Sequence, residues 1–239
     1  MSEQVNNMQQ PLRAMTMDYT VDMVFCIDAT GSMEDTTGSS RKIINMVKEN
    51  ALSFYSDFSA VMNAKKKQVR QLRVRVIAFR DYKADGDQAM LVTDFFMLPQ
   101  QEKEFETCIN SISAKGGGDI PEDGLEALAY AIKSKWTTEG AKKRQVIVVW
   151  TDASTHELGF GSDAPNYPKG MPKDLGELSD WWDDMNQNAK RLLLFSPNEP
   201  GWSYISQNWD NVIHVTSAAG NGLAEQDYSE ILGVIANSI

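Results

Sequence analysis

Apolar runs alternate with helix-like patterns along most of the chain. Six short runs, rich in β-branched and aromatic residues, predict strands at 21–27, 72–79, 89–97, 145–151, 191–196 and 211–217. Helix-like patterns occupy most of the remaining sequence, at roughly 39–62, 101–113, 122–136, 176–188 and 224–238. Because strands that alternate with helices form βαβ units, the pattern predicts an α/β fold.

The segment "VIVVW" at 146–150 refines this prediction, since every one of its residues is apolar. Such a strand is typical of a parallel sheet that is covered on both faces. We therefore expect a three-layer, doubly wound α/β architecture, with a mostly parallel central sheet and helices on both faces. Residues 1–17 are polar and aperiodic and read as an N-terminal tail, whereas 18–239 read as a single domain.

The composition is that of an ordinary globular protein, with 42% hydrophobic and 23% charged residues among 239. No apolar stretch is long enough to span a membrane, and the N-terminal segment does not resemble a secretory signal. Cys26 and Cys108 lie in apolar surroundings and read as reduced, small buried residues rather than a disulfide. We expect a cytoplasmic protein with no membrane partner.

A net charge of −10 argues against nucleic acid as a partner, because such binding requires an excess of Lys and Arg. The one basic cluster runs from Lys65 to Arg75. It reads as a charged helix end and turn, followed by a strand whose alternate side chains face solvent.

Three loops carry oxygen-bearing side chains where a strand ends or a helix begins. They are "DATGSM" at 28–33, "GGGDIPEDGLEAL" at 116–128 and "TD" at 151–152. In an open parallel sheet, ligands bind at the carboxyl ends of the strands, so we expect these loops to meet there. The candidate metal ligands are Asp28, Thr30, Ser32, Asp119 and Asp152.

Three carboxylates in one partly enclosed site repel one another, and a divalent cation removes that repulsion. Oxygen ligands favour Mg²⁺, with Mn²⁺ and Ca²⁺ as alternatives, and the chain has no Cys/His cluster of the kind that binds zinc. A simpler reading is that Asp28 and Ser32 only cap the next helix. A phosphate-binding loop at 116–118 is disfavoured, because no Lys follows in the required pattern and Asp119 would repel phosphate.

These loops resemble the metal-ion-dependent adhesion site of the von Willebrand factor A (VWA) domain family. Asp28, Thr30 and Ser32 match its D-x-S-x-S motif with one conservative replacement, and Asp152 matches the aspartate after the family's fourth strand. "GGGDIPED" places Asp119 where most members carry a threonine. Together with "AFRDY" at 78–82, it is similar to the VWA domains linked to α-type protein kinases.

The resemblance covers about residues 18–239 and implies a VWA, Rossmann-like fold. It implies that Thr30 and Ser32 bind the metal directly, while Asp28 and Asp152 orient waters. It further implies a metal-dependent adaptor that binds another protein, such as a kinase, a phosphatase or an AAA-type ATPase, in a signalling, stress or defence assembly.

A metal-assisted hydrolase or enzyme subunit is the alternative function, although no catalytic residue is assigned and we expect no enzyme. The only histidines are His156 and His214. A Ser32–His156–Asp triad can be drawn, but the G-x-S-x-G elbow is missing and Ser32 is better used as a metal ligand. His214 reads as a packed core residue of the last strand.

The segment that follows Asp152 is rich in Gly, Pro and aromatic residues, and we expect it to overhang the metal. His156, Phe160 and Tyr167 are therefore the candidate partner-binding residues. Of the neighbouring pair Trp181 and Trp182, we expect at least one to pack inward.

Overall fold

The computed structural model describes residues 18–34, 42–217, 232–234 and 236–237. The predicted tail at 1–17 and most of the predicted helix at 224–238 lie outside these residues. None of the helices in the described part of the chain combines the length and apolar composition that a membrane span needs.

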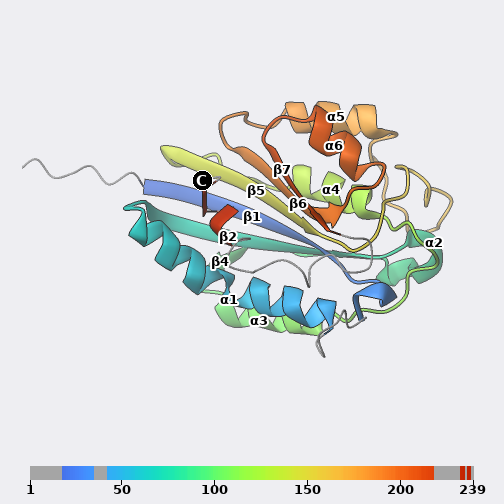
Figure 1. Ribbon diagram of the computed structural model, residues 1–239, viewed down its shortest axis with the longest axis horizontal. Helices are drawn as coiled ribbons and strands as arrows, with labels where there is room; N and C mark the ends of the chain where they lie inside the picture. The colour runs from blue at the N-terminus through green and yellow to red at the C-terminus, as the bar shows by residue number, and fades with distance from the viewer. Residues whose placement is uncertain (1–17, 35–41, 218–231, 235, 238–239) are drawn as a thin grey trace, which may run out of the picture.

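A seven-stranded sheet forms the centre of the described residues (Figure 1). Its strand order is β3-β2-β1-β5-β6-β7, and β4 also pairs with β2. The five long strands run parallel, whereas β3 and β4 are antiparallel to β2. Their bounds are β1 Asp18–Asp28, β2 Gln68–Phe79, β3 Met90–Val92, β4 Phe96–Leu98, β5 Lys142–Trp150, β6 Lys190–Pro197 and β7 Val212–Ser217. The predicted mostly parallel α/β sheet is confirmed.

Helices cover both faces of this sheet (Figure 1). One face carries α1 Ile43–Ala64 and α3 Glu102–Ser111, and the other carries α4 Gly124–Ile132, α5 Leu175–Asp183 and α6 Trp202–Asn208. Three short elements lie in the loops: η1 Gly31–Glu34, α2 Tyr82–Asp85 and η2 Gly86–Gln88. The expected three-layer arrangement is therefore present.

Strand β1 shows why an uninterrupted apolar run suits this position. Its side chains alternate between two buried clusters, with Phe25 and Ile27 in the cluster under α1 and α3, and Val24 and Cys26 in the cluster under α4 to α6. Both cysteines are free, and Cys26 is fully buried while Cys108 is half-buried on α3. Trp182 is fully buried in the second cluster, as expected for one of the paired tryptophans.

The predicted strand at 89–97 is two short strands, β3 and β4, which pair with different parts of β2. The interruption occurs around Thr93, whose hydroxyl donates to the Asp94 carbonyl and accepts from the Val76 amide. Arg75 also donates to the Thr93 carbonyl, over 2.7 Å. Contacts with β2 and with Asp94 therefore occupy the Thr93 hydroxyl and carbonyl at the point where the two short strands are separated.

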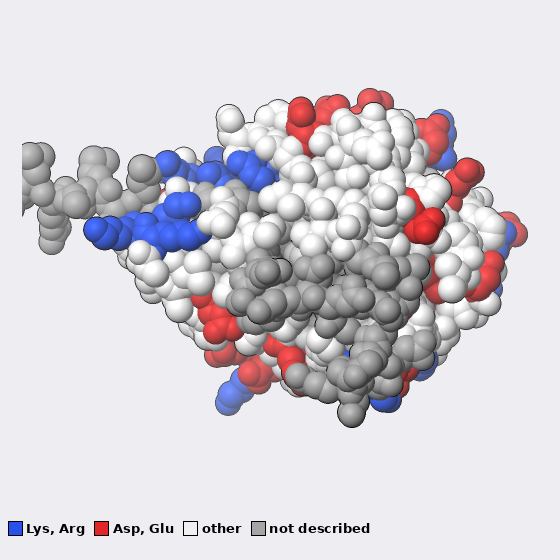
Figure 2. Space-filling model, viewed as in Figure 1, with Lys and Arg blue, Asp and Glu red and all other residues white. Residues whose placement is uncertain are grey.

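Charge is distributed unevenly over the molecule. Figure 2 shows Lys and Arg gathered at the end where β1 begins, and there Lys142, Lys143, Arg144 and Arg191 line one pocket. The carboxyl ends of the parallel strands lie at the opposite end, beside α2 (Figure 1). The candidate ligands belong to the loops at that second end.

Candidate metal centre

Two of the three predicted loops meet because β1 and β5 are neighbouring parallel strands. Ile27 pairs with Trp150 in the sheet, so Asp28 and Thr151 emerge side by side at its edge. Asp28, Thr30 and Thr151 are buried, and Asp152 is 4% exposed. These side-chain oxygens thus lie at an edge of the sheet that is almost completely shielded from solvent.

A chain of hydrogen bonds connects the side chains from these two loops. The Thr30 hydroxyl and amide donate to Asp28 Oδ1 over 2.6 and 2.9 Å. The hydroxyls of Thr30 and Ser32 are 3.1 Å apart, and Ser32 donates to Asp152 Oδ1 over 2.9 Å. Thr151 donates to Asp28 Oδ2 over 2.6 Å. Asp28, Thr30, Ser32 and Asp152 therefore form one connected set of oxygen atoms.

The electrostatics of this set favour a cation. Burial, together with the nearby charge of Asp152, raises the pKa of Asp28 to about 6, although hydrogen bonds from Thr151 and Thr30 oppose the shift. A divalent ion would offset the repulsion between these two buried carboxylates. Since every donor is oxygen, the set fits a hard cation such as Mg²⁺.

The remaining loop, at 116–128, approaches the loop at 28–33 through the backbone of its glycines. The Gly31 amide donates to the Gly116 carbonyl over 3.0 Å, and the Gly117 amide donates to Asp85 Oδ2 over 2.9 Å. Gly116 and Gly117 have φ of +73° and +77°, and a Cβ on either would clash with the Asp85 or Glu122 carboxylate. Only glycine fits this close approach.

The Asp119 side chain lies with Asp81 and His156, which belong to other loops, and not in the hydrogen-bonded set around Asp28. Its carboxylate Oδ1 lies 3.7 Å from His156 Nε2, and the side chain is 61% exposed. The described hydrogen bonds that join Asp28, Thr30, Ser32 and Asp152 do not include it. The structure thus brings four of the five predicted ligands into one network and sets the fifth in a neighbouring cluster.

Sequence reasoning missed Glu122, a carboxylate of the glycine-rich loop at 116–128 (the glycine loop). This side chain lies close to Thr30 of the first motif, the D-x-S-x-S segment at 28–32. Its Oε1 and the Cβ of Thr30 lie 2.6 and 3.2 Å from the point where a Cβ on Gly117 would stand. Glu122 is 4% exposed, and its Oε2 is buried and has no hydrogen-bond partner within the described part of the chain. Burial, together with the charges of Asp28 and Asp81, raises its pKa to about 9. Its position in "GGGDIPED" was the available signal, but spacing alone did not separate it from Asp119.

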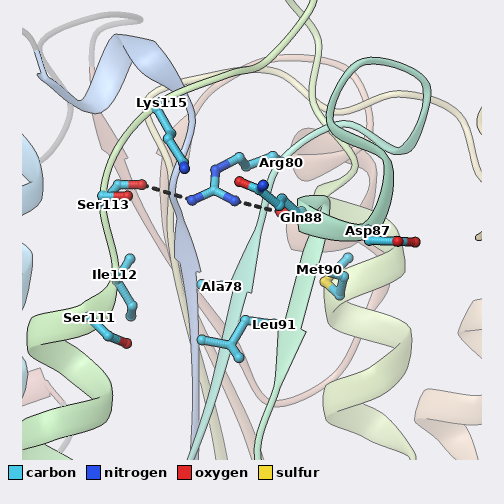
Figure 3. Close-up of a pocket in the computed structure, with 10 residues that line it drawn as sticks. All are labelled: Ala78, Arg80, Asp87, Gln88, Met90, Leu91, Ser111, Ile112, Ser113 and Lys115. Atoms are coloured by element: carbon cyan, nitrogen blue, oxygen red, sulfur yellow. Dashed lines mark hydrogen bonds between the residues drawn. The ribbon is translucent and has the colours of Figure 1, made fainter.

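Arg80 braces the loops that carry these acids (Figure 3). Its Nε donates to the Ala29 carbonyl over 2.8 Å, and its other nitrogens donate to the carbonyls of Ser113 and Gln88. The guanidinium therefore ties the loop after β1 to the loop before the glycines and to η2. It also lines the pocket drawn in Figure 3, beside Lys115.

The three candidate partner-binding residues differ in exposure. Phe160 is 42% exposed, whereas His156 is 5% exposed and stacks on Phe160 with ring centroids 3.9 Å apart. Tyr167 is half-buried, and its hydroxyl donates to Glu126 Oε1 over 2.8 Å. Phe160 therefore offers the largest accessible surface of the three.

The contacts around Ser32 do not form a nucleophile–base pair. Ser32 donates its hydroxyl proton to Asp152, whereas Nε2 of His156 faces carboxylates and makes no hydrogen bond to any described residue. His214 is half-buried on β7, where its Nε2 lies 3.0 Å from the Ser196 hydroxyl, so it is not the packed core residue we expected. Within the described residues, strand β7 forms one edge of the sheet, and Ile213 next to His214 is 40% exposed, which explains the difference.

Comparison with known proteins gives a consistent family assignment. A family model for the von Willebrand factor A domain matches residues 22–160. The alpha-protein kinase vwkA of Dictyostelium discoideum is 27% identical over 163 residues, which cover 68% of this chain and 23% of the kinase. The chain thus spans less than a quarter of that relative's length.

Two solved structures share the fold at low sequence identity. The PilB minor pilin from Streptococcus sanguinis matches with a TM-score of 0.55 and 14% identity, over 91% of this chain and 61% of the pilin. The pilus adhesin SpaC from Lactobacillus rhamnosus GG matches with a TM-score of 0.54 and 12% identity, over 91% of this chain and 30% of the adhesin. At these identities the likeness concerns the fold alone.

Proposed function

Because the chain belongs to the von Willebrand factor A domain family, we propose that it is a metal-dependent protein-interaction domain. In this proposal Asp28, Thr30, Ser32 and Asp152 hold a divalent cation, most favourably Mg²⁺, at the carboxyl edge of the sheet. The ion would present a positive charge to an oxygen-bearing group of the partner. Catalysis is not part of the proposal.

The connected oxygen network carries this proposal. Four side chains from two distant segments converge through hydrogen bonds of 2.6 to 3.1 Å, and the carboxylate at its centre is fully buried. A simple helix cap would not recruit Asp152, which lies more than a hundred residues away, through Ser32. Convergent oxygen ligands at the edge of a parallel sheet support a binding site.

Exposed apolar side chains beside this edge support a protein as the partner. Ile120 is 72% exposed in the glycine loop, and Phe160 is 42% exposed in the loop after β5. Apolar anchors next to a charged centre suit an interface in which the ion provides direction and the apolar contacts provide affinity. The kinase name of the Dictyostelium relative makes a kinase-containing intracellular assembly our first partner candidate.

Isothermal titration calorimetry with Mg²⁺ tests the metal site. We expect binding to the wild type and its loss in Asp28→Asn, which preserves the shape of the buried side chain. Asp210→Asn is the matched control, since Asp210 is exposed between α6 and β7. Equal Mg²⁺ affinity in the wild type and Asp28→Asn would refute the site.

A second experiment tests the interaction. Affinity purification from the native host, followed by mass spectrometry, should recover a protein that is lost with EDTA and with Asp28→Asn but retained with Asp210→Asn. Turnover of a generic ester or phosphoester that requires Asp28 would instead favour the metal-assisted hydrolase. Recovery of the same proteins from every sample would contradict metal-dependent recognition.

A further inference from the structure

A second cluster of ligand-type side chains lies at the same edge of the sheet. Asp81 follows β2, Asp119 belongs to the glycine loop, and His156 follows β5. One ligand atom from each residue lies within 4.8 Å of the other two. We propose that these residues form a separate site for a divalent transition-metal ion of the Zn²⁺ type. This inference does not depend on the Mg²⁺ site.

His156 provides the observation that points to a ligand. The side chain is 95% buried, because only 5% of its surface is exposed, and its Nε2 has no hydrogen-bond partner among the residues that the structure describes. That nitrogen lies 3.6 Å from Asp81 Oδ2 and 3.7 Å from Asp119 Oδ1. A buried imidazole nitrogen between two carboxylates is well placed to coordinate a metal ion, since a cation would interact favourably with all three groups at once.

Asp81 and His156 are already fixed in orientation. The amides of Lys83 and Ala84 donate to Asp81 Oδ1, over 2.6 and 3.4 Å, which leaves Oδ2 directed towards the imidazole. The His156 ring stacks on Phe160 with an angle of 13° between the planes, and Lys83 lies 4.1 Å from the Phe160 ring centre. These outer contacts hold two ligands in place before any ion arrives, as is common around protein metal sites.

Asp119 gives the cluster its access to solvent. It is 61% exposed, whereas Asp81 is 2% exposed and His156 is 5% exposed. An ion could therefore enter past Asp119 and keep water or a partner group in its remaining positions. A site with three protein ligands and an open position is the arrangement that Zn²⁺ adopts when it binds an exchangeable ligand.

The donor set separates this site from the first one. Asp28, Thr30, Ser32 and Asp152 offer only oxygen, which suits Mg²⁺, whereas an imidazole nitrogen with two carboxylates suits Zn²⁺ and related ions. The charges also balance, because two carboxylates and a dication sum to zero when His156 is neutral. The competing explanation is that His156 is protonated and forms ion pairs with Asp81 and Asp119. The experiment must separate these two cases.

Calorimetric titration with Zn²⁺ in the presence of about 10 mM Mg²⁺, which is saturating for an ordinary Mg²⁺ site, makes this distinction. We expect the wild type to bind one equivalent, and Asp119→Asn and His156→Gln to lose at least tenfold in affinity, on the order of the effect of removing outer-shell partners. Asp119→Asn is the decisive variant because its exposed side chain is not needed for folding. Asp163→Asn is the matched control, since that carboxylate is 76% exposed and pairs with Lys83 nearby.

Asp28→Asn separates this inference from the proposed function. If the two sites are distinct, this variant loses Mg²⁺ binding and keeps Zn²⁺ binding. Zn²⁺ binding that disappears with Asp28→Asn but survives Asp119→Asn would assign the ion to the first site and overturn the inference.

Nitrogen-15 NMR of the imidazole groups gives a second readout that does not depend on affinity. Zn²⁺ should shift the Nε2 resonance of His156 and leave that of His214, which lies beside Ser196, unchanged. Unchanged His156 resonances under saturating Zn²⁺, or equal Zn²⁺ affinity in the wild type, Asp119→Asn and His156→Gln, would refute the site.

Discussion

Replacing Thr151 with valine tests whether the buried carboxylate of Asp28 is held as the structure describes. Thr151 is 1% exposed, and its hydroxyl donates to Asp28 Oδ2 over 2.6 Å. The same hydroxyl accepts a hydrogen bond from the Ala153 amide over 3.1 Å. Valine keeps nearly the same volume and removes both bonds, so Thr151→Val isolates the polar contribution.

The expected loss follows from these two contacts. A hydrogen bond to a charged group contributes roughly 1.5–3 kcal/mol, and a bond between neutral groups roughly 0.5–1.5 kcal/mol. Thr151→Val should therefore lower the free energy of unfolding by about 2–4.5 kcal/mol. For a chain of this length that corresponds to a fall in melting temperature of at least about 4 °C.

Urea unfolding in EDTA at pH 7.5 measures this loss without any bound cation. Thr107→Val is the matched control, because Thr107 is exposed on α3 and donates only to the Lys103 carbonyl of its own helix. The control should stay within about 0.5 kcal/mol of the wild type. If Thr151→Val also stays within that range, Thr151 does not stabilise Asp28 and the description of the network is wrong.

Three further predictions address the hydrophobic core, the loop contacts of Arg80 and the buried acidic residues. Leu193→Ala should cost about 2–5 kcal/mol in urea unfolding, since Leu193 is 1% exposed, while Leu91→Ala, at 41% exposure, should cost about 1 kcal/mol or less. Arg80→Met should cost roughly 2–4 kcal/mol and weaken Mg²⁺ binding in calorimetry, and Arg80→Lys should recover only part of both, because lysine cannot reproduce three diverging donors. Burial raises the pKa of Glu126, so the folded state retains a proton that the unfolded state releases, and wild-type stability in EDTA should fall as the pH rises above 4.5 towards the raised value. Glu126→Gln should make that fall less steep at pH values above 4.5. An unchanged slope would contradict the assignment.

Most of the fold could be predicted from the sequence because the sheet is buried on both faces. Strands β5 and β6 then contain apolar runs bounded by polar residues, and their positions follow directly from the pattern, as for 145–151 and β5. The segment 89–97 was harder, because its interruption depends on contacts that Thr93 makes with Val76 and Arg75 of another strand. Such contacts leave no trace in local periodicity.

The candidate site could be predicted only where the strand order determines it. Asp28 ends β1 and Asp152 lies just after β5, and because these strands are neighbours, the loops that follow them must meet. The glycine loop follows no strand directly, so its course depends on the positive φ of Gly116 and Gly117 and on the bond to Asp85. Spacing could not show that Glu122 turns towards the first motif while Asp119 turns towards His156.

Glu122 is coupled electrostatically to both carboxylate clusters at this edge. The charges of both Asp28 and Asp81 raise the pKa of Glu122, although these two aspartates belong to different clusters. Two like charges about 4 Å apart repel by about 4 kcal/mol at a partly buried surface, so the edge holds its arrangement at neutral pH only if protons or cations offset that repulsion. Protonation reduces the repulsion but does not bring the oxygens into a defined arrangement, whereas a metal ion fixes the positions of the oxygens around it. A cation at either cluster would therefore favour the ionised form of Glu122. It would also order the loop that carries both Glu122 and Asp119. Through Glu122, an ion at one cluster would thus influence the geometry of the other.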